Sequence, residues 1–149
     1  MSSLKYYVPE GHCEERKVKY YYTQAVRVGD RIETSGQARL TCGLGGWHPK
    51  TGVIHTNLKD EIDEAFRNCE LNLKTAGGKG WSQVFRVTSY HVPLTDEALE
   101  ICVENFKKYM PDHQPVWTAV GVPALGSPEG HIEIECNAYD PEGAAKAAQ

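Results

Sequence analysis

Residues 115–139 constrain the fold most strongly, because they have the pattern of two strands joined by a loop. The first half is apolar and partly β-branched, and residues 126–130 supply the glycines and the proline of a turn. Residues 132–135 then alternate isoleucine with glutamate, which is the period-two pattern of a strand with one buried face. Glu133 and Glu135 therefore share one face of this strand. Such carboxylates are common on a strand face that meets water. If the face lines a cleft, they are instead candidates for a catalytic or binding role.

The composition indicates one globular domain over residues 1–149. No apolar run approaches the roughly 20 residues that a membrane-spanning helix needs. The N-terminus also lacks the uninterrupted apolar core of a signal peptide. We therefore expect a cytoplasmic protein with no membrane partner. The net charge is −4 and the basic residues are scattered, which argues against capture of nucleic acid.

The cysteines and histidines show no metal-binding pattern. The five cysteines include no CxxC pair, and the six histidines include no HExxH pair. We therefore expect no disulfide framework, no metal site and no cofactor. Cys69 and Cys102 fall on apolar faces of predicted helices, where they are expected to be small buried side chains. The glycines of residues 43–52 are not followed by the Lys-Ser or Lys-Thr of a phosphate-binding loop, so a surface loop is expected there.

Strand-type composition predicts three further strands. Valine, tyrosine and threonine concentrate in short segments bounded by glycine and proline. The predicted strands occupy residues 17–28, 31–35 and 84–92. Residues 1–16 are expected to be partly irregular, and residues 141–149 are expected to form a small, polar, frayed tail.

Two helices are expected between these strands. From Leu58, apolar residues recur at steps of three and four, which predicts an amphipathic helix with Asn57 as its N-cap. A second helix is expected between the N-cap Thr95 and Pro111. The order ββαβαββ predicts an α+β fold with one mixed sheet and two helices on one face. The other face must meet water or a second subunit, and its apolar residues favour an oligomer.

Several local strings resemble the reactive intermediate deaminase (Rid) family, also called the YjgF family. They follow one another in the order and at the spacing of that family over roughly residues 17–139. The matching strings are YTQAV at 22–26, VGD at 28–30, TSGQ at 34–37, PKTG at 49–52, VTSY at 87–90 and IEIE at 132–135.

The resemblance implies a chorismate-mutase-like homotrimer with a small-molecule cleft between each pair of subunits. In deaminating members, an arginine binds the substrate carboxylate, and a tyrosine and a glutamate place the water that hydrolyses an imine or enamine. The matching positions for the tyrosine and the glutamate are Tyr22 and Glu133. Gly36 matches the position at which family members offer backbone groups to the ligand.

The chain departs from the family at the arginine. The family's P-x-R-S/T stretch aligns with residues 115–118, so that Trp117 stands where the arginine is expected. Tryptophan offers one N–H and a flat apolar face, and it cannot hold a carboxylate by two charge-assisted hydrogen bonds. Trp117 can form a wall of the cleft or pack as a core or interface aromatic. Arg39 is a candidate replacement cation, and Thr118 and Ser35 are candidate hydrogen-bond donors.

Three functions remain open at this level. The first is a divergent Rid-type enzyme in which Glu133 assists water or proton transfer on an imine, an enamine or a related substrate, and which is not the ordinary 2-iminoacid deaminase. The second is a non-catalytic trimer that binds a metabolite. The third is an RNA-cleaving translation inhibitor, against which the acidic charge and the missing metal motif argue.

Overall fold

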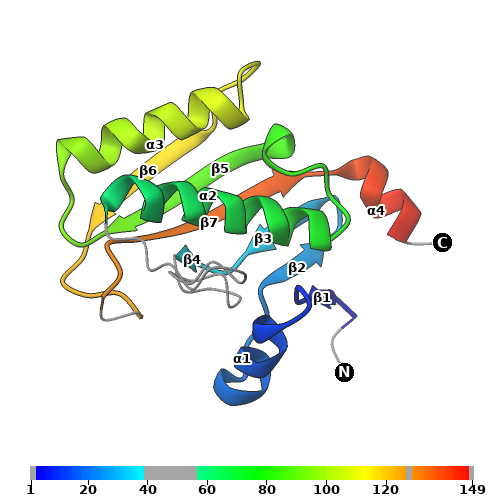
Figure 1. Cartoon of the computed structure of the whole chain (residues 1–149). Coiled ribbons are helices and arrows are strands. Elements are labelled where there is room, and N and C mark those ends of the chain that lie inside the picture. The colour runs from blue at the N-terminus through cyan, green and yellow to red at the C-terminus, as the bar shows by residue number, and fades with distance from the viewer. Residues whose placement is uncertain (1–2, 39–56, 127–128, 148–149) are drawn as a thin grey trace.

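The computed structural model describes residues 3–38, 57–126 and 129–147. One mixed sheet forms the centre of the molecule, and helices α2 (Leu58–Thr75) and α3 (Asp96–Tyr109) lie side by side across one of its faces (Figure 1). This arrangement confirms the predicted α+β class, with a mixed sheet and two long helices on one face.

The described elements also include seven strands, two further helices and a short 3-10 helix. The strands are β1 (Lys5–Tyr7), β2 (Ala25–Val28), β3 (Arg31–Thr34), β4 (Gln37–Ala38), β5 (Val84–His91), β6 (Val116–Gly121) and β7 (Ile132–Tyr139). The remaining helices are α1 (His12–Tyr20), the 3-10 helix η2 (Trp81–Gln83) and α4 (Pro141–Ala147).

Strand β7 lies at the middle of the sheet, whose order is β1-β2-β3-β7-β5-β6. It pairs antiparallel with β5 along one side, and with both β3 and β4 along the other. Strands β5 and β6 are parallel, and α3 forms the crossover between them. Strand β7, which the sequence predicted from residues 132–135, thus pairs with more of the described strands than any other does. Its side chains have neighbours from strands on both sides.

The ends and faces of the two long helices follow the sequence pattern. The Asn57 side chain caps α2 by accepting a hydrogen bond from the Asp60 N–H at 2.8 Å, and Thr95 caps α3 by accepting from the Ala98 N–H at 3.2 Å. The apolar stripe of α2 is buried against the sheet. There, Phe66 stacks on Trp81 with ring centroids 4.7 Å apart.

The N-terminal region differs from the sequence prediction. A strand was expected over residues 17–28, but residues 17–20 form the second half of α1 and β2 begins only at Ala25. Glutamates in the first turn and lysines in the last turn of α1 complement the helix dipole, which favours a helix over the strand that the tyrosines indicated. The helix ends at Tyr20, and the φ of 56° at its C-cap residue Tyr21 turns the chain toward β2. Residues before it are also more ordered than expected, because β1 pairs with β2.

The cysteine pattern is partly as expected. Cys69 and Cys102 are buried and free, as is Cys136. Cys13 of α1 is also fully buried, but it is disulfide-bonded. The described cysteines therefore include three free core side chains and one, Cys13, whose disulfide bond the sequence did not indicate.

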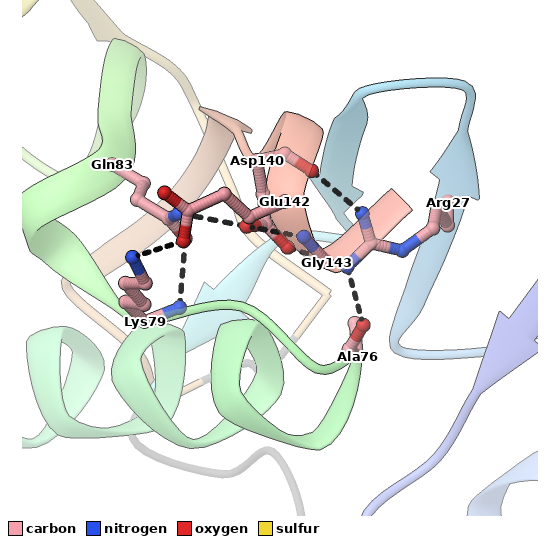
Figure 2. A network of polar contacts seen from close by, with 7 residues as sticks. All are labelled: Arg27, Ala76, Lys79, Gln83, Asp140, Glu142 and Gly143. Carbon is pink, nitrogen blue, oxygen red and sulfur yellow. Dashed lines mark hydrogen bonds and ion pairs between the residues drawn. The ribbon is translucent and has the colours of Figure 1, made fainter. Parts of the chain in front are cut away.

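The C-terminal segment was expected to fray, but residues 141–147 form α4 next to a buried ion pair (Figure 2). Asp140 precedes this helix, and its Oδ2 lies 2.7 Å from Arg27 Nη2. The Asp140 Oδ1 accepts hydrogen bonds from Gln83 Nε2 and from the Gly143 N–H. A Cβ at Gly143 would lie 2.9 Å from Arg27 Nη2, so this position has no room for a side chain. The network holds the start of α4 against β2 and the η2 region.

Within residues 3–38, 57–126 and 129–147, no helix is both long and apolar enough to cross a bilayer. In the same ranges, no group of three or more histidine, cysteine, aspartate or glutamate residues is arranged to hold a metal ion.

Candidate functional site

Glu133 and Glu135 lie on one face of β7, as the alternation predicted, and the adjacent strand adds a tyrosine to them. Glu133 is in register with Ala38 of β4 and with Tyr90 of β5. Residues paired in this way point to the same face of a sheet. The Tyr90 hydroxyl donates a hydrogen bond to Glu135 Oε1 at 3.0 Å. Tyr90 and the two glutamates therefore form a polar cluster on the face opposite the buried isoleucines of β7.

Gly36 brings the chain backbone against the Glu133 carboxyl group. A Cβ at Gly36 would overlap Glu133 Oε1 and would lie only 2.6 Å from its Cδ. Any side chain at this position would displace the carboxyl group. The glycine that interrupts the strand pattern between β3 and β4 thus leaves the space that Glu133 occupies. The structure brings together these two sequence-predicted site residues.

The surroundings of Glu133 change its acidity. Burial raises the pKa of the Glu133 carboxyl group, the nearby charge of Glu135 raises it further, and the charge of Arg16 lowers it. The pKa of Tyr90 is also raised, first by its hydrogen bond to Glu135 and then by burial. A carboxyl group with a raised pKa holds its proton closer to neutral pH, as a general acid must.

Arg16 is a contributor that the sequence did not single out. It lies in α1, in a region that was expected to be partly irregular, and it affects Glu133 through its charge. Its guanidinium carbon is also 5.4 Å from the centre of the Tyr20 ring. The expected replacement cation, Arg39, lies outside the described residues.

Tyr22 and Ser35 are joined through a buried amide rather than by direct contact. Gln24 Nε2 donates to the Tyr22 hydroxyl at 3.1 Å, and the Ser35 hydroxyl donates to Gln24 Oε1 at 3.2 Å. Gln37 Nε2 donates to the same Gln24 oxygen at 3.0 Å. Neither glutamine was identified as a candidate from the sequence. Their places in the strings YTQAV and TSGQ are the signal that could have found them.

Trp117 is on the opposite face of the sheet from Glu133. It is in register with Val87 of β5, whereas Glu133 is in register with Tyr90 three residues along the same strand. The Trp117 indole N–H donates to the Ser89 hydroxyl oxygen at 2.9 Å, and its ring meets Phe106 of α3 edge to face at 5.0 Å. Within one chain, Trp117 and Glu133 therefore do not form one site.

Trp117 nevertheless borders a hollow of about 720 Å³ between α3 and the start of β6. This volume is within the range of small-molecule pockets. Apolar and polar side chains both line it. Those from α3 and the loop after it include Phe106, Lys107, Met110 and His113.

Thr118 is on the same face as the two glutamates, but it lies on β6. It pairs with Thr88 of β5, which pairs in turn with Glu135 of β7. Two strand spacings therefore separate Thr118 from Glu135, a distance of about 10 Å between backbones. A direct hydrogen bond between these two side chains is out of reach.

Comparison with known proteins gives a consistent result. The model of the family described as Endoribonuclease L-PSP matches residues 14–140. The RutC family protein YjgH of Escherichia coli (strain K12) is 25% identical over 116 residues, which cover 78% of this chain and 82% of YjgH.

Solved structures agree with this match. The structure of protein YjgH is 25% identical with a TM-score of 0.72, and the comparison covers 95% of this chain and 99% of that one. Rv2704 from Mycobacterium tuberculosis, a member of the YjgF/YER057c/UK114 family, has the same fold at 22% identity and a TM-score of 0.70, with 92% and 99% coverage. Escherichia coli TdcF, solved with bound serine, is 25% identical with a TM-score of 0.65, with 79% and 87% coverage. The chain therefore belongs to the endoribonuclease L-PSP family, as its resemblance to the Rid and YjgF proteins indicated.

Proposed function

We propose that the protein is a divergent Rid-type homotrimer that binds a small metabolite between neighbouring subunits. In this proposal, the Glu133 carboxyl group assists proton or water transfer on an imine, an enamine or a related substrate. The observation that carries the proposal is the placement of Glu133, which is half-buried against Gly36 and has a raised pKa. A solvated strand carboxylate would have neither the close backbone contact nor the raised pKa.

The placement of Trp117 supports a site made from two copies of the chain. Glu133 and Trp117 lie on opposite faces of one sheet, so they can line a common cleft only if different subunits supply them. The face that carries Glu133 also exposes apolar side chains, among them Val116 and Tyr139, which are each more than half exposed. Burying such side chains against another copy would stabilise an oligomer.

Imine hydrolysis is chemistry that this arrangement can support. A protonated Glu133 donates its proton to the imine nitrogen, which makes the carbon more electrophilic. Water then attacks that carbon, and the carboxylate accepts the proton that the water loses. Collapse of the adduct breaks the carbon–nitrogen bond, so that imine and water become a carbonyl compound and ammonia.

The contacts of Trp117 support a substrate other than the ordinary 2-iminoacid. Its single N–H is already bonded to Ser89, and its ring packs on Phe106. An arginine at this position would offer a fork of donors to a carboxylate. The aromatic ring instead offers a flat apolar wall. We therefore expect a less acidic or aromatic substrate.

Hydrolysis of two imine classes tests the proposal. An amino-acid oxidase generates 2-iminoacids, and an amine oxidase generates imines without a carboxylate. We expect the protein to accelerate decay of the carboxylate-free imine more strongly, and we expect Glu133→Gln to lower the rate by about 100-fold or more. Glu33→Gln is the matched control, because Glu33 is also a half-exposed strand glutamate. If Glu133→Gln and Glu33→Gln behaved alike, the proposed role of Glu133 would be abandoned.

Subunit mixing tests the shared cleft. Glu133→Gln and Trp117→Ala are each expected to lower turnover as pure proteins, and co-refolded mixtures should regain part of it, since some clefts then receive an intact residue from each subunit. Sedimentation that showed only monomers at micromolar concentration would contradict the trimer.

A non-catalytic metabolite-binding trimer is the second candidate, and the tryptophan in place of the family's arginine favours it. Saturable binding without turnover of either imine class would support it, and robust turnover would exclude it. RNA cleavage is the weakest candidate, because the net charge of −4 does not favour binding of a polyanion. Cleavage that copurified with the protein and was lost in Glu133→Gln would revive it.

A further inference from the structure

A chain of buried amides connects helix α2 to Tyr22. Asn72 Nδ2 of α2 donates to Gln37 Oε1 at 2.7 Å, and Gln37 Nε2 donates to Gln24 Oε1 at 3.0 Å. Gln24 Nε2 completes the chain by donating to the Tyr22 hydroxyl at 3.1 Å. The three amide residues are buried, with relative exposures of 0–1%. Hydrogen bonds within such a chain are strong because little water competes for the donors and acceptors.

Backbone carbonyl groups fix the direction of this chain. Asn72 Nδ2 also donates to the Asn68 carbonyl oxygen at 2.9 Å, and Gln37 Nε2 also donates to the Ser35 carbonyl oxygen at 2.9 Å. A carbonyl oxygen can only accept, so neither amide can be flipped without placing two oxygens against each other. The orientation of Gln37 therefore determines which end of Gln24 faces it.

The orientation of Gln37 also fixes the orientation of the Gln24 side-chain amide. Its Oε1 accepts from both Gln37 Nε2 and the Ser35 hydroxyl, so its Nε2 must face Tyr22. The Tyr22 oxygen is then an acceptor toward Gln24, and its own proton is left for another group. This polarity is a property of the fold, because helix α2, strand β4 and the segments before β2 and β4 together impose it.

We propose that Gln24 is a positioning residue that makes Tyr22 a hydrogen-bond donor to the ligand, so that the ligand presents a lone pair there, such as a carbonyl oxygen or an imine nitrogen. This inference rests on the proposed function and on the match of Tyr22 to the tyrosine that helps place the hydrolytic water in deaminating Rid members. It goes further by giving the chemical type of the ligand atom at Tyr22. A ligand that offered only a hydrogen-bond donor at this position would have to compete with Gln24 Nε2 for the Tyr22 oxygen.

The polarity can be tested without any ligand. In protein labelled with ¹⁵N-glutamine, the side-chain NH₂ protons of Gln24 should show nuclear Overhauser contacts to the Tyr22 ring protons beside the hydroxyl. Gln24→Leu assigns the signal because it removes it. Contacts from that NH₂ group to Ser35 and Gln37 instead, with none to Tyr22, would overturn the inference whether or not the protein proves to be an enzyme.

A pair of isosteric probes tests the consequence for binding. Acetophenone carries a carbonyl oxygen where α-methylstyrene carries a CH₂ group. Wild type is expected to bind acetophenone about tenfold more tightly, as one added hydrogen bond implies. Tyr22→Phe should lose this preference, because it lacks the donor. Gln24→Glu should also lose it, because a carboxylate only accepts and would draw the Tyr22 proton toward itself.

The double variant distinguishes positioning from a general structural effect. If Gln24 acts through the hydroxyl, Tyr22→Phe combined with Gln24→Glu should show the same probe preference as Tyr22→Phe alone. Tyr21→Phe is the matched control, since Tyr21 is 96% exposed, and it should keep the preference of wild type. A retained preference in Gln24→Glu would contradict the inference. Failure of wild type to bind either probe would instead count against the proposed ligand site, and the spectroscopic test would still decide the polarity.

Discussion

Replacing Asp140 with alanine would leave the Arg27 guanidinium buried without its carboxylate. The two side chains are only 6% and 1% exposed, and Arg27 Nη2 lies 2.7 Å from Asp140 Oδ2. The substitution also removes the acceptor for Gln83 and for the Gly143 N–H, which holds the first turn of α4 (Figure 2). Breaking one side of a buried pair costs about 3–5 kcal/mol, because the remaining charge stays desolvated.

Urea unfolding at a fixed protein concentration measures this loss. With a slope of about 2 kcal/mol per molar urea, a loss of about 4 kcal/mol moves the midpoint down by about 2 M. Glu142→Gln is the matched control. It breaks the ion pair between Glu142 and Lys79, whose side chains are 68% and 61% exposed, and exposed pairs contribute less than about 1 kcal/mol.

The pH dependence gives a second check on the same pair. Burial alone would raise the pKa of Asp140, but hydrogen bonds from Arg27, Gln83 and Gly143, together with the Arg27 charge, lower it on balance. A lowered pKa in the folded state gives stability that is present above the unfolded value of about 3.9 and is lost as the pH falls through the folded value. The difference between wild type and Asp140→Ala should therefore be constant near neutral pH and shrink below about pH 4. A midpoint shift no larger than that of Glu142→Gln would show that the buried pair of Arg27 and Asp140 contributes no more than an exposed one.

Three other substitutions test particular contacts. Gly36→Ala should displace the Glu133 carboxyl group, because the added Cβ would lie 2.6 Å from Glu133 Cδ, and loss of imine turnover with a retained fold would be the readout. An unchanged rate would show that the close approach is not needed. Asn57→Ala should cost about 1 kcal/mol of stability in urea unfolding, since it removes the α2 cap, whereas Asn57→Gly should cost only a few tenths. Equal losses would argue against side-chain capping. Glu133→Gln should stabilise the protein near neutral pH, because a raised folded-state pKa disfavours the ionised carboxylate there. This gain should disappear as the pH falls below the unfolded glutamate value of about 4.3, and a gain that did not vary with pH would contradict the raised pKa.

The helices and central strands were predictable because their signals are local. The caps Asn57 and Thr95, the apolar stripe of α2 and the alternation of β7 each lie within one turn or one strand of the residues that they organise. The same local logic failed for residues 17–20. Their tyrosines have a strand composition, but charges at both ends of α1 and the turn at Tyr21 favour a helix.

The candidate site was predictable only in part. The resemblance identified Glu133 and Gly36, and the structure brings them into contact. It also identified Trp117, but not the face of the sheet on which Trp117 lies. That face depends on the register in which β5 pairs with β6 and β7, because a shift of one residue moves a side chain to the other face. Tyr90 and Arg16 join Glu133 from β5 and α1, and no spacing in the sequence links those segments.

Sequence patterns alone were enough to identify the two long helices with their caps, the strands before, between and after them, and the placement of two glutamates on one face of β7. These depend on residues a few positions apart, whose periodicity matches the geometry of a helix or a strand. Three contacts became visible only in the folded chain: Arg27 meets Asp140, Gln24 is oriented toward Tyr22, and Trp117 faces away from Glu133. These contacts join residues that differ in position by up to 113, or depend on the direction of buried hydrogen bonds, and both are settled only when the sheet and helices pack together.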